Sequence, residues 1–431
     1  MRRPSCLLLF VALLAPGTAQ ARVEVQHWSA TSGARVFFVQ SRSLPILDIS
    51  VEFAAGSGHD PSGKAGLARL AQTLVKTGTA QISEAEIGRR LGDVGAILGD
   101  VFDRDRAGFT LRTLSSPPER ERSLGTMAEM VQAPAFPAAA FEREKARLAA
   151  GSREAETRPG ELAERRFYAL SYAGHSYGAS PTADSVAAIS AEDVERFHGD
   201  HYTADNAVVT IVGDGSRDDA SRIAEQLTSR LPRGRAMEPA PLAAPGAGET
   251  LRVPLLSEQA HILLGLPALR RTDPDYFPLF VGNFVLGGGG FVSRLYREVR
   301  EERGFAYSVY SYFVPLERPG PFLVGLQTRR DQADEALAQV RRVVGRFLAK
   351  GPTGRELALA KNALVGGFSL RVDSNRKILD QVALMAFYRL PSDWLDEFVP
   401  NVRKVTLEQV REAFARHVDP ARLVTVIVGA P

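Results

Sequence analysis

The stretch GLARLAQTLVKTGT, residues 66–79, decides how the first half of this chain is expected to fold. Its apolar residues lie three and four positions apart, which is the spacing of an amphipathic helix. They are Leu67, Leu70, Ala71, Leu74 and Val75, and the opposite, polar face carries Arg69, Gln72, Thr73 and Lys76. Gly78 follows the last apolar residue and is a suitable end for the helix.

The residues that frame this polar face resemble a known family motif. They are Gly66 and Ala68 before its centre, and Gly78 and Thr79 after it. The same frame surrounds the zinc helix of the insulinase/pitrilysin and processing-peptidase family, the inverzincins, whose motif is H-x-x-E-H. The two histidine positions map onto Arg69 and Thr73, and the glutamate position maps onto Gln72. The third zinc ligand of the family, a glutamate farther along the chain, maps onto Ala150.

These four positions hold residue types that are unsuited to a catalytic zinc site. Zinc needs imidazole, thiolate or carboxylate ligands, whereas Arg69 is always cationic and Ala150 has no ligand atom. Gln72 cannot take a proton from a metal-bound water as glutamate can. The resemblance therefore implies a non-catalytic member of a protease family, with no metal or other cofactor bound by this chain.

The first 21 residues have the pattern of a secretory signal peptide. Two arginines precede an apolar run from Cys6 to Ala15, and an A-x-A site ends at Ala21. A buried N-terminal strand or helix is the alternative. Cys6 is the only cysteine, so the mature chain would contain no disulfide. The sequence predicts a periplasmic or secreted protein without a stable membrane span, and the pattern favours a bacterial periplasm.

The charge of the chain is close to balanced. It has 53 Lys and Arg against 50 Asp and Glu, a formal charge of +3, which becomes +1 without Arg2 and Arg3. Because nucleic-acid binding needs a basic surface, this balance argues against nucleic acid as a partner.

An internal repeat organises the chain. Residues 190–213 match residues 406–429 without a gap, at an offset of 216 residues. The identical pairs are Glu192/Glu408, Val194/Val410, His201/His417, Val208/Val424, Ile211/Ile427, Val212/Val428 and Gly213/Gly429. Each copy reads as helix cap, helix, apolar strand and glycine. We therefore predict two duplicated domains, 22–230 and 251–431, joined by a linker rich in Pro, Ala and Gly at 231–250.

The family resemblance implies the fold class α+β. Each duplicated domain would be an antiparallel sheet covered by helices, as in the processing-peptidase-like metallohydrolase fold. Two such chains could enclose a chamber of peptide size. The residues themselves predict a strand at Ile46–Phe53, two strands between Ala96 and Leu114, and a helix from Ser83 with a capping box to Glu86.

A second family signature survives in the other half. The segment 287–307, GGGGFVSRLYREVREERGFAY, resembles the motif G-G-G-x-x-S-R-L followed by R-x-x-x-x-x-x-Y. The arginine and tyrosine of that motif map onto Arg300 and Tyr307. In the family this pair reaches the zinc site from the other half of the chamber, binds substrate backbone and helps to stabilise the oxyanion. The alternative is a solvated arginine and a half-buried strand tyrosine.

The glycines of this segment permit two interpretations. Gly288, Gly289 and Gly290 could approach a substrate backbone closely, as a glycine-rich loop does in the related processing peptidase. They could equally be a connector between two helices. His198 and His201 could suggest a metal site, but Phe414 replaces His198 in the repeat, which favours packing roles.

Three functions from different classes remain open. The first is a non-catalytic subunit of an exported heterodimeric zinc metallopeptidase. Its partner would be a family member that bears H-x-x-E-H and zinc, and the substrate would be a peptide. The second is a structural or peptide-binding scaffold without a protease role. The third is an independent metallopeptidase with a rebuilt site, which no visible ligand cluster supports.

Overall fold

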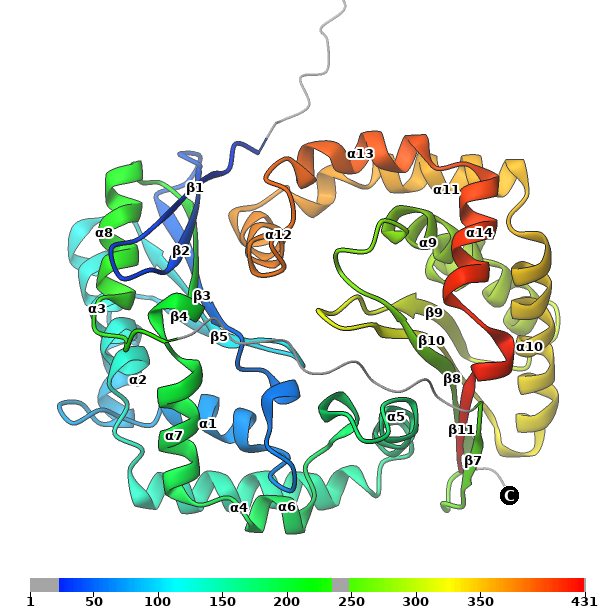
Figure 1. Ribbon diagram of the computed structural model, residues 1–431, viewed down its shortest axis with the longest axis horizontal. Helices are drawn as coiled ribbons and strands as arrows, with labels where there is room; N and C mark the ends of the chain where they lie inside the picture. The colour runs from blue at the N-terminus through cyan, green and yellow to red at the C-terminus, as the bar shows by residue number, and fades with distance from the viewer. Residues whose placement is uncertain (1–22, 235–247, 430–431) are drawn as a thin grey trace, which may run out of the picture.

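The computed structural model describes residues 23–234 and 248–429, and its two halves face each other, each built on one sheet (Figure 1). The first sheet has the order β1-β2-β6-β3-β5-β4, and the second has the order β7-β11-β8-β10-β9. The first six strands are β1 Gln26–Ser29, β2 Arg35–Gln40, β3 Ile46–Phe53, β4 Ile97–Phe102, β5 Ala107–Leu114 and β6 Val208–Gly213. The other five are β7 Thr250–Val253, β8 Gln259–Leu269, β9 Ser308–Phe313, β10 Gly320–Arg329 and β11 Val424–Val428.

The sheets are mixed rather than wholly antiparallel, which corrects the expected fold in one respect. β2 pairs with β6 in parallel, and β7 pairs with β11 in parallel, while the other pairings are antiparallel. The last strand of each half returns after a long helical segment, and a crossover of that length permits parallel pairing.

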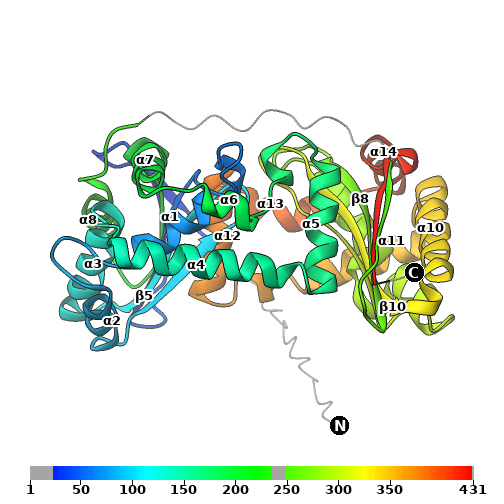
Figure 2. The same cartoon turned by 90° about the horizontal axis from the view of Figure 1, so that it is seen from below.

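Helices cover both sheets. The first half contains α1 Leu67–Val75, α2 Glu84–Gly92, α3 Pro117–Gln132, α4 Ala138–Ala155, α5 Pro159–Ser171, α6 Ala183–Ala187, α7 Ala191–His201 and α8 Arg217–Thr228. The second half contains α9 Tyr276–Asn283, α10 Ala333–Lys350, α11 Gly354–Gly366, α12 Asn375–Phe387, α13 Trp394–Lys404 and α14 Leu407–His417. The layers of helices against sheets are also visible from below (Figure 2).

The duplication predicted from the sequence is present in the fold. α7 and β6 of the first half correspond to α14 and β11 of the second at the same offset, although α8 follows β6 in the first half. Both helices begin with a complete capping box, formed by Ser190 with Asp193 and by Thr406 with Gln409. The repeated histidines also play equivalent roles, because His201 Nδ1 lies 2.9 Å from a carbonyl oxygen of Ala54 and His417 Nδ1 lies 2.9 Å from that of Ala268.

Each half lends one helix to the sheet of the other half. α5 packs against β8 and β11 of the second sheet, and α12 packs against β3 and β6 of the first (Figure 1). The first contact buries Phe167 and Tyr172 with Val426, and the second buries Val382 and Met385 with Val212. Because an apolar sheet has two faces to cover, this exchange joins the halves into one structure.

Asp105 joins the halves at the turn between β4 and β5. Its carboxylate accepts hydrogen bonds from the Tyr177 hydroxyl, from the Tyr388 hydroxyl at 2.7 Å and from the Glu317 backbone N–H at 2.8 Å. Asp105 is buried, and burial raises the pKa of its carboxyl group. Two of the three donors belong to the second half, so this carboxylate is a polar link between the two sheets.

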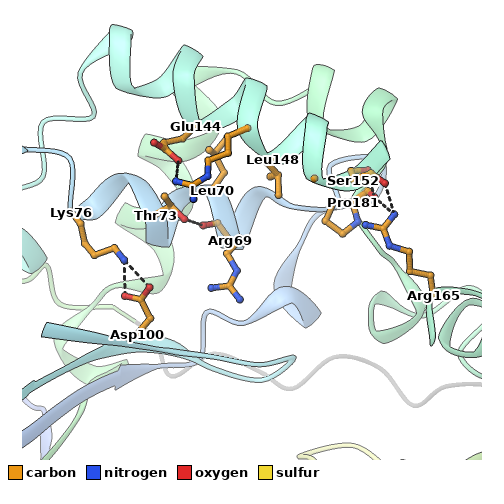
Figure 3. A pocket seen from close by; sticks show the side chains of 12 residues that line it. Arg69, Leu70, Thr73, Lys76, Asp100, Glu144, Leu148, Ser152, Arg165 and Pro181 are labelled. Carbon is orange, nitrogen blue, oxygen red and sulfur yellow. Dashed lines mark hydrogen bonds and ion pairs between the residues drawn. The ribbon is translucent and has the colours of Figure 1, made fainter. Parts of the chain in front are cut away.

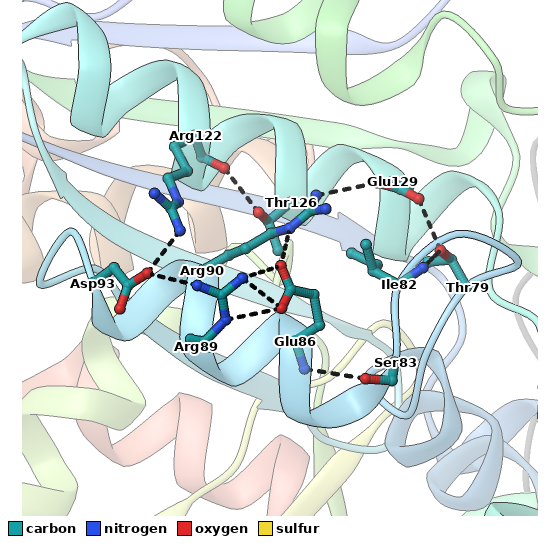
Figure 4. Close-up of polar contacts among 10 residues, drawn as sticks. All are labelled: Thr79, Ile82, Ser83, Glu86, Arg89, Arg90, Asp93, Arg122, Thr126 and Glu129. Atoms are coloured by element: carbon teal, nitrogen blue, oxygen red, sulfur yellow. Dashed lines mark hydrogen bonds and ion pairs between the residues drawn. The ribbon is translucent and has the colours of Figure 1, made fainter.

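The segment after the α1 helix is held by a polar network between α2 and α3 (Figure 4). Ser83 caps α2 as predicted, since its hydroxyl accepts from the Glu86 N–H at 3.2 Å. The Glu86 side chain does not complete the predicted capping box, because it binds Arg89 and Arg90 instead. Thr79 of the family frame donates to Glu129 of α3 at 2.8 Å.

Several sequence predictions concern residues outside the described part. The signal peptide at 1–21 and most of the linker lie there, so their structure is not addressed. Within residues 23–234 and 248–429, no helix combines the length and apolar character needed to cross a membrane.

Candidate functional site

α1 forms at the residues that resemble a zinc helix. A glycine conformation and a pair of hydrogen bonds fix its start. Gly66 adopts a φ of +105°, which favours glycine. The half-buried Asp60 carboxylate accepts the Gly66 and Ala68 N–H groups, each at 2.7 Å. Burial raises the pKa of Asp60 to about 6, although both N–H bonds oppose the shift. The periodicity therefore predicted this helix correctly.

Gln72 lies deeper than its position on the polar face predicted. It is 1% exposed, and its amide nitrogen donates to the carbonyl oxygens of Val101 at 2.7 Å and Gly108 at 2.9 Å. Val101 and Gly108 are paired across β4 and β5, so the side chain ties α1 to this hairpin. The hairpin closes over one side of α1, which a helical wheel does not show.

The other two positions of the former motif are also engaged. Arg69 donates to the Gln72 side-chain oxygen at 3.1 Å, and its guanidinium carbon lies 3.8 Å from the centre of the Phe102 ring. The Thr73 hydroxyl donates to the Arg69 carbonyl oxygen at 2.9 Å. A guanidinium, an amide that donates two hydrogen bonds and a hydroxyl turned to its own helix do not fit a divalent metal.

A cavity of about 480 Å³ lies beside α1 at this place (Figure 3). From α4 it is lined by Glu144, Arg147, Leu148, Gly151 and Ser152. Ala150, the expected third position, is exposed and is not among the residues that line it. Glu144 is the acid that α4 presents here, and it receives a hydrogen bond from Arg143 at 2.9 Å.

Among the described residues, one cluster has three possible metal ligands close together, and it lies in the second half. It consists of Asp273, Asp275 and His417. Arg416 donates to both Asp275 oxygens, at 2.9 and 2.8 Å. Because a guanidinium already neutralises this carboxylate, the cluster gives no support to a rebuilt metal site.

Arg300 and Tyr307, the pair that matches the family motif, lie together. Arg300 belongs to the π-helical turn η6 (Tyr296–Glu301), and Tyr307 directly precedes β9. The Arg300 guanidinium carbon lies 5.3 Å from the Tyr307 ring centre and 4.7 Å from that of Tyr296. Tyr307 is 77% exposed, so its phenol is available at the surface rather than packed in the sheet.

Gly287, Gly288, Gly289 and Gly290 differ in why the structure favours glycine at each position. A Cβ on Gly287, Gly288 or Gly289 would lie within 2.6 Å of Ser311, Asn283 or Phe284 respectively. The chain here forms the π-helical turn η4 (Phe284–Gly288), whose close packing needs glycine. Gly290 meets no such obstacle and adopts a φ of +58°. Packing within the second half thus accounts for Gly288 and Gly289 without a substrate.

The structure also shows two residues that the sequence did not bring forward as site residues. Arg104 and Phe102, from the β4–β5 hairpin, line a second cavity together with Arg69. No local pattern marked them, because the β4–β5 hairpin meets Arg69 of α1 only in the tertiary structure.

His198 and His201 are packing residues of α7. His198 Nε2 lies 3.1 Å from the Val131 carbonyl oxygen, and burial lowers the pKa of its ring from 6.5 to about 4. The ring is neutral in the folded state, so protonation favours the unfolded state. The stability that His198 contributes is present above pH 6.5 and is lost as the pH falls towards 4.

We expect His198→Phe to flatten this acid dependence. Phe414 occupies the equivalent position of the repeat and is buried there, so phenylalanine suits this type of helix. Between pH 6.5 and 4 the variant should lose about 3 kcal/mol less free energy of unfolding than the unmodified chain. Urea unfolding at several pH values measures this difference. An unchanged pH slope would contradict the neutral, buried state of the ring.

Comparison with known proteins agrees with this geometry. The model of the insulinase family, peptidase family M16, matches residues 35–184, and the model of the peptidase M16 inactive domain matches residues 188–364. The crystal structure of a peptidase M16 inactive domain from Pseudomonas fluorescens is 36% identical and has a TM-score of 0.91. The matched region is 95% of this chain and 98% of the chain in that crystal structure. This chain belongs to peptidase family M16.

Other M16 relatives include proteins named as proteases and one named as a non-peptidase. The non-peptidase homolog YmxG of Helicobacter pylori is 25% identical over 400 residues, which are 91% of this chain and 91% of that protein. An uncharacterized zinc protease of Streptomyces coelicolor is 26% identical over 417 residues, which are 94% of this chain and 89% of that protein. The M16 fold is therefore shared with proteins called proteases and with one called a non-peptidase.

Proposed function

We propose that this M16 chain is the non-catalytic subunit of an exported heterodimeric zinc metallopeptidase. Its partner would be an M16 protein with H-x-x-E-H, which would hold the zinc and the general base. This chain would supply Arg300 and Tyr307 to the peptide and to the oxyanion at the partner's zinc. The proposal joins two features: a zinc helix that does not fit zinc, and a preserved arginine–tyrosine pair.

The exposed position of Tyr307 beside the half-buried Arg300 is the observation that carries the proposal. A tyrosine that is 77% exposed contributes little to the core of its own half. Its hydroxyl and the Arg300 guanidinium are both hydrogen-bond donors, and the stacking of the guanidinium on Tyr296 and Tyr307 restricts its direction. Donors of this kind gain strength when a partner excludes water from them.

The sheet next to the pair could also hold an extended peptide. β9 is the edge strand of the second sheet, and it begins at Ser308, directly after Tyr307. A peptide added to this edge would form backbone hydrogen bonds close to the phenol. Binding and oxyanion stabilisation would then be neighbouring tasks of one segment.

Co-expression with an H-x-x-E-H member of the family tests the proposal. We expect a quenched peptide to be cleaved by the pair and not by this chain alone. In the pair, Arg300→Ala and Tyr307→Phe should each lower kcat/KM about a hundredfold, the effect of losing one oxyanion donor.

Arg303→Ala is the matched control for this experiment. Arg303 lies on the same segment, is exposed and forms no ion pair within the described residues. Its loss should leave kcat/KM within about twofold. Full activity of both Arg300→Ala and Tyr307→Phe would refute the assigned roles. A partner that is fully active by itself, or that does not associate, would instead favour the structural or peptide-binding scaffold.

A further inference from the structure

Two arginines face a cavity at the place where a zinc helix would hold its metal. Arg69 of α1 and Arg104 of the β4–β5 turn both line a cavity of about 360 Å³. Leu148 of α4 and the segment 179–181 complete its wall. The cavity of about 480 Å³ beside α1, whose lining is drawn in Figure 3, shares Arg69, Leu148 and Pro181 with it, so the two cavities adjoin at these residues.

Each guanidinium is held in place by an aromatic ring. That of Arg69 lies 3.8 Å from the centre of the Phe102 ring, and that of Arg104 lies 3.3 Å from the centre of the Tyr168 ring. Arg104 Nε also donates to the Tyr177 carbonyl oxygen at 3.1 Å. Stacking occupies the face of a guanidinium and leaves N–H donors at its edge, which is the geometry that recognises a carboxylate.

Neither arginine forms an ion pair with any carboxylate in the part of the chain that the structure describes. Arg69 is half-buried, and burial lowers the pKa of its guanidinium. The charge of Asp100, which is paired with Lys76, opposes this shift only in part. A partly desolvated cation is therefore stabilised when an anion from outside pairs with it.

The acids around the two cavities are already engaged elsewhere. Asp60 accepts the first N–H groups of α1, and Asp103 pairs with Arg106 at 2.8 Å. Asp100 pairs with Lys76 at 2.7 Å, and Glu144 pairs with Arg143 at 2.9 Å. These partners explain why the acids do not neutralise Arg69 and Arg104.

We infer that the former zinc position of this chain is a carboxylate-binding site, in which Arg69 and Arg104 hold an acidic group of a bound peptide. The choice of a peptide as the bearer of the carboxylate rests on the proposed function. The adjoining cavity of about 480 Å³, which also borders Arg69, Leu148 and Pro181, has room for a ligand longer than a single anion. The replacement of histidine by arginine then changes the ligand from a cation to an anion.

Calorimetric titration of the chain alone, without any partner, tests this site. The probes are three otherwise identical decapeptides of Ala, Thr and Leu. One has a central Glu and an amidated end, one has Gln and an amidated end, and one has Gln and a free carboxyl end. We expect the Glu peptide or the free-ended peptide to bind at least tenfold more tightly than the amidated Gln peptide. The better of the two identifies a side-chain or a terminal carboxylate as the recognised group.

Variants of the chain then locate the site. Arg69→Gln and Arg104→Gln should each abolish the preference for the carboxylate, and Arg69→Lys should reduce it because it loses the planar fork. Arg147→Gln is the control, since Arg147 lines the neighbouring cavity but its side chain is 84% exposed. It should keep the preference.

The result that overturns the inference does not depend on how the variants fold. Equal binding of all three peptides to the unmodified chain, or no binding of any, would exclude a carboxylate site. An equal loss in Arg147→Gln would show general charge attraction instead. The titration uses no partner, so it remains valid if no heterodimer forms. If the titration shows no carboxylate preference, the roles proposed for Arg300 and Tyr307 are not affected.

Discussion

Gln72→Glu should destabilise the chain by about 4 kcal/mol at pH 8 and should not create a zinc site. The Gln72 amide donates to the carbonyl oxygens of Val101 and Gly108, and the side chain is 1% exposed. A glutamate would lose both donors and place a buried negative charge against two carbonyl oxygens. The cost combines two lost hydrogen bonds with the desolvation of a buried charge, which Arg69, 3.1 Å from the present side-chain oxygen, would offset only in part.

The free energy of unfolding of the Gln72→Glu variant should depend on pH. Burial and the two facing carbonyl oxygens should raise the pKa of the new carboxyl group in the folded state more than Arg69 lowers it, so the variant is least destabilised at low pH and loses stability as the pH rises. Urea unfolding at pH 5 and pH 8 measures the difference. Gln72→Met, which loses the donors but adds no charge, should cost about 2 kcal/mol at both pH values. A Gln72→Glu chain as stable as the unmodified chain at pH 8 would refute this account.

Asp105→Ala should cost about 4 kcal/mol and loosen the contact between the halves. Its carboxylate accepts from Tyr177, Tyr388 and the Glu317 N–H, and it is 3% exposed. Alanine would leave two buried hydroxyl donors and the half-buried Glu317 N–H without this acceptor, and each buried donor costs about 1–3 kcal/mol. Relief of the desolvation that raises the pKa of Asp105 offsets part of the sum.

Equilibrium unfolding in urea is the measurement, with Tyr388→Phe and Asp93→Ala beside it. Tyr388→Phe removes one of the three donors and should cost about 1 kcal/mol. Asp93 forms ion pairs with Arg89 and Arg122 at the surface, so Asp93→Ala should cost less than about 1 kcal/mol. Equal effects of Asp105→Ala and Asp93→Ala would show that Asp105 is not a link between the halves.

Local patterns predicted the individual elements well. The strand at Ile46–Phe53 has the predicted bounds, and α1 follows the apolar spacing of residues 67–75. Both kinds of element depend on residues only a few positions apart, which a sequence displays directly. The repeat at an offset of 216 residues likewise identified the duplicated halves.

The same reasoning was wrong where distant segments decide the environment of a side chain. Gln72 was placed on a polar face, but the β4–β5 hairpin covers it through bonds that span 29 and 36 residues.

The sequence of this M16 chain is enough to show that Arg69, Gln72 and Thr73 stand where the family motif has His, Glu and His, because residue types are read directly from a sequence. It also shows the spacing of Arg300 and Tyr307. The exchange of α5 and α12 between the sheets, and the cavity that Arg69 and Arg104 share, became visible only in the folded structure. Tyr388 and Asp105, 283 residues apart, illustrate the reason. Contacts at that separation depend on how whole sheets pack, and no local periodicity records them.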